Sequence, residues 1–132
     1  MASNLQSIFA NLSEKECVLG HHSAEGHAVR TLSRALQGWS SGSIGGLDVV
    51  TLCDQAIEDW LKARLRVSAW SATGLRQLLA PAVAAKLLTL AESVRLQAVH
   101  KLRDQPNGDA IAVSDIEAAL ESTIEIVEKH WS

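Results

Sequence analysis

The stretch ESVRLQAVHKLRDQPNGD, residues 92–109, carries two side chains whose types and spacing could do chemistry. They are Arg95 and His100, which stand in the pattern R-x4-H. Histidine gives or takes a proton near neutral pH, and arginine offers a permanent charge with a donor fork suited to phosphate. Together they could cleave a phosphodiester without a metal ion, with His100 as general acid or base.

Three further charged side chains close to His100 extend this candidate site. Lys101 and Arg103 would add positive charge that holds a phosphate group. Asp104 follows His100 by four residues, about one helical turn, and would either orient the imidazole ring or only cap it. We therefore assign substrate binding to Lys101 and Arg103, and a supporting role to Asp104.

The angle between Arg95 and His100 argues against a site on one face of a single helix. Five positions of an α-helix turn through about 500°, which leaves the two side chains about 140° apart. A second copy of the helix across a two-fold axis would gather both pairs in a common cleft. The apolar residues expected to be buried in such a contact are Leu88, Leu96 and Val99. The alternative is an ordinary helix end, where His100 meets the dipole's negative pole and Arg95 pairs with Glu92.

The clearest predicted helix lies upstream of this motif, in LDVVTLCDQAIEDWLKARLRV, residues 47–67. Its apolar side chains recur at helical spacing, which predicts one buried stripe. This stripe consists of Val50, Cys53, Ile57, Trp60 and Leu61. The side chains expected to face solvent are Asp54, Glu58, Asp59 and Lys62.

The motif itself is expected on a long helix that runs from Pro81 to about Asp104. Its predicted buried side consists of Val83, Leu87, Leu90, Ala91, Val94 and Ala98. The sequence QPNG at 105–108 would end it, because proline stops a helix and Asn-Gly turns the chain. Ser114 and Glu117 form an S-x-x-E capping box, which predicts the start of the last helix.

The chain as a whole is predicted to be one helical domain, residues 1–132. The loop SSGSIGG at 40–46 separates an N-terminal helical segment, residues 1–40, from the rest. In that segment helical spacing relates Leu5, Ile8, Phe9 and Leu12, and again Val29, Leu32, Leu36 and Trp39. The expected fold is all-α, a bundle of four to five helices with short connections.

Composition and charge indicate a folded core, a location in the cell and a surface charge. The apolar share of 47% supports a folded core, and the longest apolar run is too short to span a membrane. The first residues lack the pattern of a signal peptide, and two cysteines make no disulfide framework, so a cytoplasmic location is expected. The net charge is −3, yet residues 51–104 hold 8 basic and 5 acidic side chains, which favours a modest positive surface there.

Two stretches of the chain are similar to a known family. CDQAIEDWLKARL (53–65) is amphipathic, contains acidic residues and ends in Lys-Ala-x-Leu-like sequence, and AESVRLQAVHKLRD (91–104) carries the R-x4-H motif just before a turn and a final helix. Both resemble the HEPN domain, an all-α fold named for higher eukaryotes and prokaryotes nucleotide-binding. The resemblance covers about residues 47–132. The chain departs from the family at Leu96 and Leu102, where relatives often carry a polar residue and a tyrosine.

The resemblance implies a metal-independent endoribonuclease that acts as a homodimer. His100 would promote attack of a ribose 2′-OH on the adjacent phosphate, and Arg95 would hold that phosphate. It also implies a toxin–antitoxin or defence system with a protein antidote, although the chain has no tyrosine for a partner to modify. The alternative is a non-catalytic HEPN-like module for dimerisation, nucleotide binding or protein interaction.

Other candidate residues are weaker. Glu58 is either an acidic residue that faces the cleft, as in some relatives, or a solvated helix position. The stretch CVLGHHSAEGH, residues 17–27, contains cysteine and histidine, which zinc takes as ligands. No second ligand pair follows it, so neither a metal nor another cofactor is expected.

Overall fold

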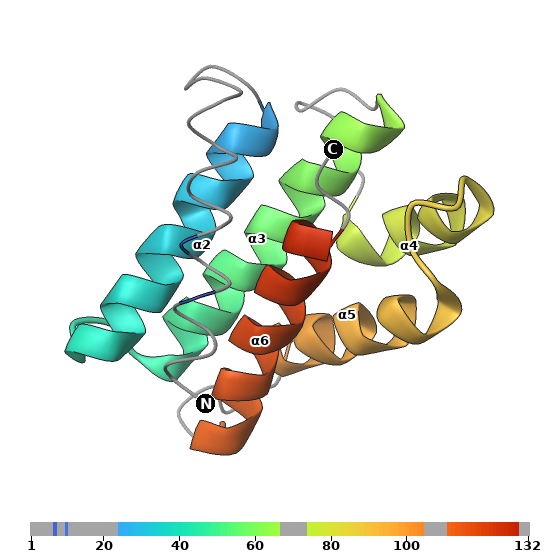
Figure 1. The fold of residues 1–132 in the computed structure, drawn as a ribbon. Helices are drawn as coiled ribbons and strands as arrows, with labels where there is room; N and C mark the ends of the chain where they lie inside the picture. Colours follow the sequence, from blue (N-terminus) through green and yellow to red (C-terminus); the bar gives the residue numbers. More distant parts are fainter. Residues whose placement is uncertain (1–6, 8–9, 11–23, 67–73, 105–110, 130–132) are drawn as a thin grey trace.

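Helices make up the described part of the chain in this computed structural model (Figure 1). The structure describes residues 7, 10, 24–66, 74–104 and 111–129. The helices in the three long ranges are α2 (Ala24–Ser41), α3 (Gly46–Leu65), α4 (Leu75–Ala84), α5 (Leu90–Arg103) and α6 (Val113–Lys129). These ranges contain no strand, so the predicted all-α bundle is confirmed. The helix predicted around Leu5 and Leu12 lies outside the described residues, apart from Ser7 and Ala10, which are helical.

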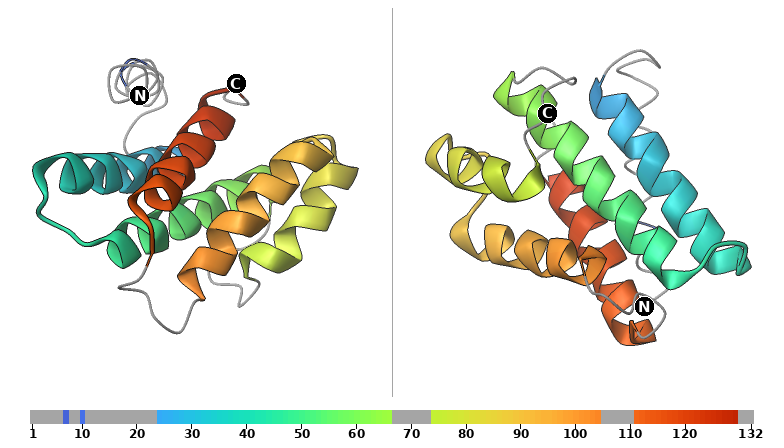
Figure 2. Two further views of the ribbon diagram at one scale, coloured as in Figure 1. Left: turned by 90° about the horizontal axis from the view of Figure 1, so that it is seen from below. Right: turned by 180° about the vertical axis from the view of Figure 1, so that it is seen from behind.

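The central helix of the bundle is α3, which packs against α2, α4, α5 and α6. Figures 1 and 2 show α2 and α3 side by side, with α6 lying across this pair. The hairpin of α4 and α5 packs on another side of α3. Because α3 is surrounded in this way, a polar side chain on its inner faces must find its partners within the protein.

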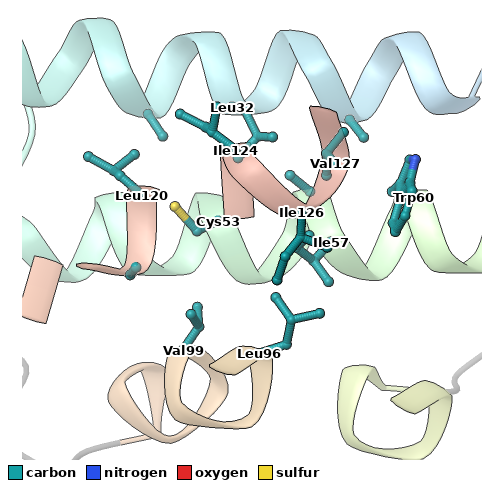
Figure 3. Close-up of a cluster of buried hydrophobic side chains, with 14 of the residues drawn as sticks. Leu32, Cys53, Ile57, Trp60, Leu96, Val99, Leu120, Ile124, Ile126 and Val127 are labelled. Atoms are coloured by element: carbon teal, nitrogen blue, oxygen red, sulfur yellow. The ribbon is translucent and has the colours of Figure 1, made fainter. Parts of the chain in front are cut away.

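The core forms where four helices meet around α3 (Figure 3). Cys53, Ile57 and Trp60 of α3 are fully buried there, as the apolar stripe of residues 47–67 predicted. The side chains that pack with them from the other helices include Leu32, Leu96, Val99, Leu120, Ile124, Ile126 and Val127. Each large apolar side chain buried in this way contributes about 1.5–3 kcal/mol.

The prediction of one helix from Pro81 to about Asp104 is wrong, because a turn divides this stretch into two helices. α4 ends at Ala84, and Lys86 takes a φ of 62°, which turns the backbone out of the helix. Pro81 lies inside α4 instead of in a first turn. Its ring removes one helical hydrogen bond and crowds the preceding turn, which favours an early end to the helix.

A capping box starts the next helix. Thr89 Oγ1 accepts a hydrogen bond from the N–H of Glu92 at 3.2 Å, and Glu92 Oε1 accepts one from the N–H of Thr89 at 2.9 Å. The capping box predicted at Ser114 and Glu117 is not formed. α6 already begins at Val113, so Ser114 lies within its first turn and not before it.

The buried side of α5 also differs from the prediction. Leu96 and Val99 face the core, whereas Leu90 is 72% exposed and Val94 is 58% exposed. Ala91 and Ala98, also predicted to be buried, are exposed with them. Apolar side chains occur around much of this helix, so their spacing could not decide which side packs against α3 and α6.

Candidate functional site

A fully buried carboxylate lies at the centre of the candidate site. Asp54 of α3 is 0% exposed, although the sequence analysis placed it on the solvent side of this helix. It follows Val50 by four residues and precedes Ile57 by three, so it shares their buried stripe. A carboxylate removed from water is very costly unless charged or hydrogen-bonding partners surround it.

Two basic side chains of α5 supply these partners. Oδ1 of Asp54 lies 2.9 Å from Nδ1 of His100, and Oδ2 accepts a hydrogen bond from Nη1 of Arg103. This hydrogen bond raises the pKa of Arg103, so its guanidinium remains charged. The carboxylate therefore ties the middle of α3 to the last turn of α5. Arg103, predicted to bind substrate, is held by Asp54.

The second ring nitrogen of His100 faces another carboxylate. Nε2 lies 3.3 Å from Oδ2 of Asp104, the residue that sequence reasoning paired with this ring. The His100 side chain is 23% exposed, and Asp104 is mostly exposed. In the neutral ring, donation from Nδ1 to Asp54 leaves Nε2 as an acceptor, whereas the protonated ring donates to both carboxylates. The buried contact thus determines which nitrogen is available at the surface.

His100 also lines a hollow between α4 and α5. The hollow has a volume of about 340 Å³ and lies between the first turn of α4 and the second half of α5. Its lining consists of Arg76, Leu79, Gln97, His100, Lys101 and Asp104. We call it the α4–α5 hollow. A ligand in it would meet the imidazole, two cationic side chains and an amide.

Arg95 lies on a different side of α5. Its Nε donates to Oγ of Ser122 at 3.2 Å, and its Nη2 lies 3.2 Å from Oε2 of Glu125, both on α6. It does not line the α4–α5 hollow, and its ion pair is with Glu125 and not with Glu92, the partner suggested for an ordinary helix end. Because the two side chains leave α5 about 140° apart, Arg95 contacts α6 whereas His100 contacts α3. Within one chain, Arg95 and His100 do not share a site.

Glu58 stands one turn after Asp54 and is not part of the carboxylate–histidine contact. Its carboxylate lies 3.4 Å from Nζ of Lys62, which is itself buried and was expected to face solvent. Glu58 acts on the site only through its charge, which helps to raise the pKa of Arg103. The acidic residue of α3 that contacts His100 is Asp54.

The apolar residues proposed for a dimer contact are already buried within the chain. Leu88, Leu96 and Val99 belong to the core, with Leu96 fully enclosed. They pack beneath α5 against the rest of the bundle and have no surface left for a second copy. The prediction that these three residues form a dimer interface is wrong.

The thiol and metal candidates add no chemistry in the described ranges. Burial raises the pKa of Cys53 to about 12, and so its thiol remains protonated and unreactive at neutral pH. Of Cys17, His21, His22 and His27, only His27 lies in the described part, and its Nε2 is 3.7 Å from Asp59. In that part no three histidine, cysteine or acidic side chains come together as a metal site.

Comparison with known proteins does not identify the chain. No protein-family model matches it, and neither does any curated protein or solved structure. Within the described residues, none of the helices has the length and apolar character needed to cross a membrane.

Sequence reasoning named His100, Lys101 and Asp104 as site residues but not Asp54, Arg76 or Gln97, which contact the His100 ring or line the hollow. Asp54 carried a usable signal, because a carboxylate stood at a position of the apolar stripe in residues 47–67. Arg76 carried none. Its place beside His100 depends on how α4 and α5 pack, and that follows from the break between these helices.

Proposed function

We propose that the protein is a metal-independent endoribonuclease in which His100 transfers the proton of the cleavage step. The observation that carries this proposal is the contact between the buried carboxylate of Asp54 and Nδ1 of His100. A carboxylate at one ring nitrogen fixes the tautomer and orientation of a catalytic histidine. The other nitrogen lies beside Asp104, which lines the α4–α5 hollow together with His100, Arg76 and Lys101, and the last two supply positive charge.

In the proposed reaction, Nε2 of His100 takes the proton from a ribose 2′-OH. The 2′-oxygen attacks the adjacent phosphorus and the bond to the 5′-oxygen breaks. The leaving 5′-oxygen takes a proton from the imidazolium, which restores the neutral ring. The products are a 2′,3′-cyclic phosphate and a 5′-hydroxyl. Asp104 must turn away from Nε2 when the substrate enters, which its exposed position at the end of α5 permits.

We also propose that the enzyme is a homodimer that pairs through the exposed side of α5. Leu90, Val94 and Ala98 follow one another at four-residue intervals on this side. This exposed stripe separates the side that carries Arg95 from the side that carries His100. If two copies of α5 pack side by side in the same direction around a two-fold axis, Arg95 of one copy lies on the His100 side of the other. Arg95 could then hold the phosphate across the interface.

Light scattering on the full chain tests this assembly. Val94→Glu should convert a dimer to a monomer without unfolding it, because the substituted side chain points into water. Glu121→Lys, a charge change on α6 outside this stripe, is the matched control and should remain dimeric. A wild-type monomer at micromolar concentration would contradict the assembly but not the chemistry of His100.

Incubation with RNA tests the cleavage itself. We expect wild type to cut single-stranded RNA and leave 2′,3′-cyclic phosphate ends, in the presence of a chelator, while DNA of the same sequence survives. His100→Ala should lose about 10²–10⁴-fold in rate, the usual contribution of a positioned acid or base. Arg95→Ala should also reduce cleavage if the dimer forms as proposed. Cleavage that requires a metal ion, or equal cleavage by His100→Ala, would refute the mechanism.

The resemblance to HEPN domains suggests a toxin or defence enzyme with a protein antidote, and co-expression with neighbouring genes would test that role.

A second candidate is a non-catalytic module that dimerises or binds a nucleotide or protein. The observation that favours it is that both motif residues have partners inside the chain. Arg95 holds α6 through Ser122 and Glu125, and His100 links α3 to α5 through Asp54. In that case wild type and His100→Ala would leave RNA equally intact, and both would show the same association in solution.

A further inference from the structure

Two cationic side chains in the α4–α5 hollow lack an acidic partner among the described residues. Arg76, in the first turn of α4, and Lys101, near the end of α5, line this hollow and are exposed. No ion pair with a described carboxylate holds either of them. By contrast, the arginines nearest to them on α5 are fixed, Arg95 by Glu125 and Arg103 by Asp54. Arg76 and Lys101 therefore have their donors free for a ligand.

The balance of charge in the hollow favours an anion. Its lining contains the cations of Arg76 and Lys101, the imidazole of His100 and only one carboxylate, that of Asp104. This carboxylate is directed to Nε2 of His100 and is largely exposed, so it can rotate into solvent. The volume of about 340 Å³ leaves room for a phosphate group with part of the attached sugar.

We propose that, within one chain, Arg76 binds the phosphate next to His100, the role that the R-x4-H pattern assigned to Arg95, which would reach this phosphate only from a second copy. The guanidinium of Arg76 offers a fork of donors that matches two phosphate oxygens. Lys101 adds a second charge from the opposite helix, and the amide of Gln97 offers further donors and an acceptor for the attached sugar. The inference rests on the proposed function for the choice of phosphate in RNA, but the anion site does not need the cleavage step.

Within one chain, Arg76 places a guanidinium in the α4–α5 hollow, whereas Arg95 does not. It comes from α4 and reaches the hollow from the side opposite to α5, so a phosphate there would lie between Arg76 and the imidazole. The guanidinium of Arg95 donates hydrogen bonds to Ser122 and Glu125. A substrate phosphate could recruit it only by breaking that ion pair.

The test is calorimetric titration of the full chain with inorganic phosphate and, separately, with a short single-stranded RNA. Arg76→Ala should lower the affinity for phosphate about tenfold or more, as expected when a charged hydrogen-bond donor is lost. Arg76→Lys should recover part of it by keeping the charge. Arg34→Ala is the matched control, since Arg34 is an exposed arginine of α2 that lines a separate hollow. Thermal unfolding of each variant confirms that it is folded.

Each outcome separates this inference from the proposed ribonuclease. Loss of phosphate binding in Arg76→Ala but not in Arg34→Ala supports the inference, even if wild type leaves RNA intact and the ribonuclease proposal fails. Equal phosphate binding by Arg76→Ala and wild type, or no binding by wild type at millimolar phosphate, overturns it. If RNA is cleaved, Arg76→Ala should raise KM for RNA. An unchanged KM together with unchanged phosphate binding would leave the ribonuclease standing without Arg76.

Discussion

The carboxylate of Asp54 on α3 lies 2.9 Å from Nδ1 of His100 on α5, a contact between residues 46 positions apart in the chain. Because Asp54 is fully buried and His100 is partly exposed, the contact connects the core to the surface of the α4–α5 hollow. The same carboxylate binds Arg103, so three ionisable groups depend on one another. The first prediction follows from that dependence.

Asp54→Asn should destabilise the protein by about 1.5–3 kcal/mol, because it removes the buried carboxylate that accepts the hydrogen bond of the partly exposed Arg103 guanidinium. Chemical denaturation with urea would measure the change. Asp48→Asn makes the same substitution at an exposed position in the first turn of α3 and should cost far less. An equal cost at both positions would mean that the buried cluster contributes no special stability.

If the protein cleaves RNA as we propose, the substitution should also slow this cleavage beyond its effect on folding. An asparagine can donate its own N–H to Nδ1, which favours the other tautomer of the ring and removes the acceptor at Nε2. The readout is the cleavage rate of the folded variant at a temperature well below its unfolding transition. A folded Asp54→Asn protein with the wild-type rate would show that Asp54 only stabilises the bundle.

A second prediction distinguishes the two sides of α5. Leu96→Ala should lower the free energy of unfolding by about 2–5 kcal/mol, because the side chain is fully buried and its removal leaves a cavity. Val94→Ala, two residues earlier, should change it by less than about 0.5 kcal/mol, since this side chain is mostly exposed. Urea unfolding of both variants at one protein concentration, low enough to exclude association, gives the comparison. Similar losses would mean that α5 is rotated relative to the described structure.

A third prediction concerns alkaline pH. The folded state raises the pKa of Cys53 from 9.0 to about 12, mainly because burial disfavours the thiolate. Below about pH 9 the thiol is protonated in both states, so its contribution to stability is fully present. Above it the unfolded chain releases the proton while the folded chain keeps it, and stability should fall by up to about 1.4 kcal/mol per pH unit until the folded pKa is passed.

Cys53→Ala should remove this part of the alkaline slope. The comparison is best made with Cys17→Ala already in both proteins, so that Cys53 is the single thiol of the reference chain. Lysine side chains titrate in the same range, but they contribute equally to the two proteins. Identical slopes with and without Cys53 would show that this thiol is accessible to water in the folded state.

The sequence predicted the elements of the fold better than their boundaries. The apolar stripe of residues 47–67 identified α3 and most of its buried face, because the buried side chains there are apolar apart from Asp54 and Lys62. The end of α4 was missed, since Pro81 was assigned to a helix start and the Thr89–Glu92 capping box was overlooked. Both signals are local, and a reading that weighed Thr89 as a cap would have separated α4 from α5.

The site was predictable only in part. Helix geometry alone indicated that Arg95 and His100 diverge, and their contacts with α6 and α3 agree with that. The partner of each depends on tertiary packing, which periodicity does not contain. Asp54 could have been suspected as a polar residue on a buried stripe, whereas Arg76 became a candidate only once α4 was seen beside α5.

The last prediction concerns Asp104, whose carboxylate would oppose the anion that we propose for the α4–α5 hollow. Its Oδ2 lies 3.3 Å from Nε2 of His100, and it is the single carboxylate in the lining of the α4–α5 hollow. Asp104→Asn removes this negative charge while it keeps the shape of the side chain. The variant should therefore bind inorganic phosphate more tightly than wild type, by a factor of about 2–5, the usual size of an exposed charge interaction. The gain should shrink as salt is added, because exposed charges are screened. Asp115→Asn, the same change at another exposed aspartate, in the first turn of α6, should leave phosphate affinity unaltered. Weaker binding by Asp104→Asn would mean that the carboxylate orients His100 for the ligand and does not compete with it.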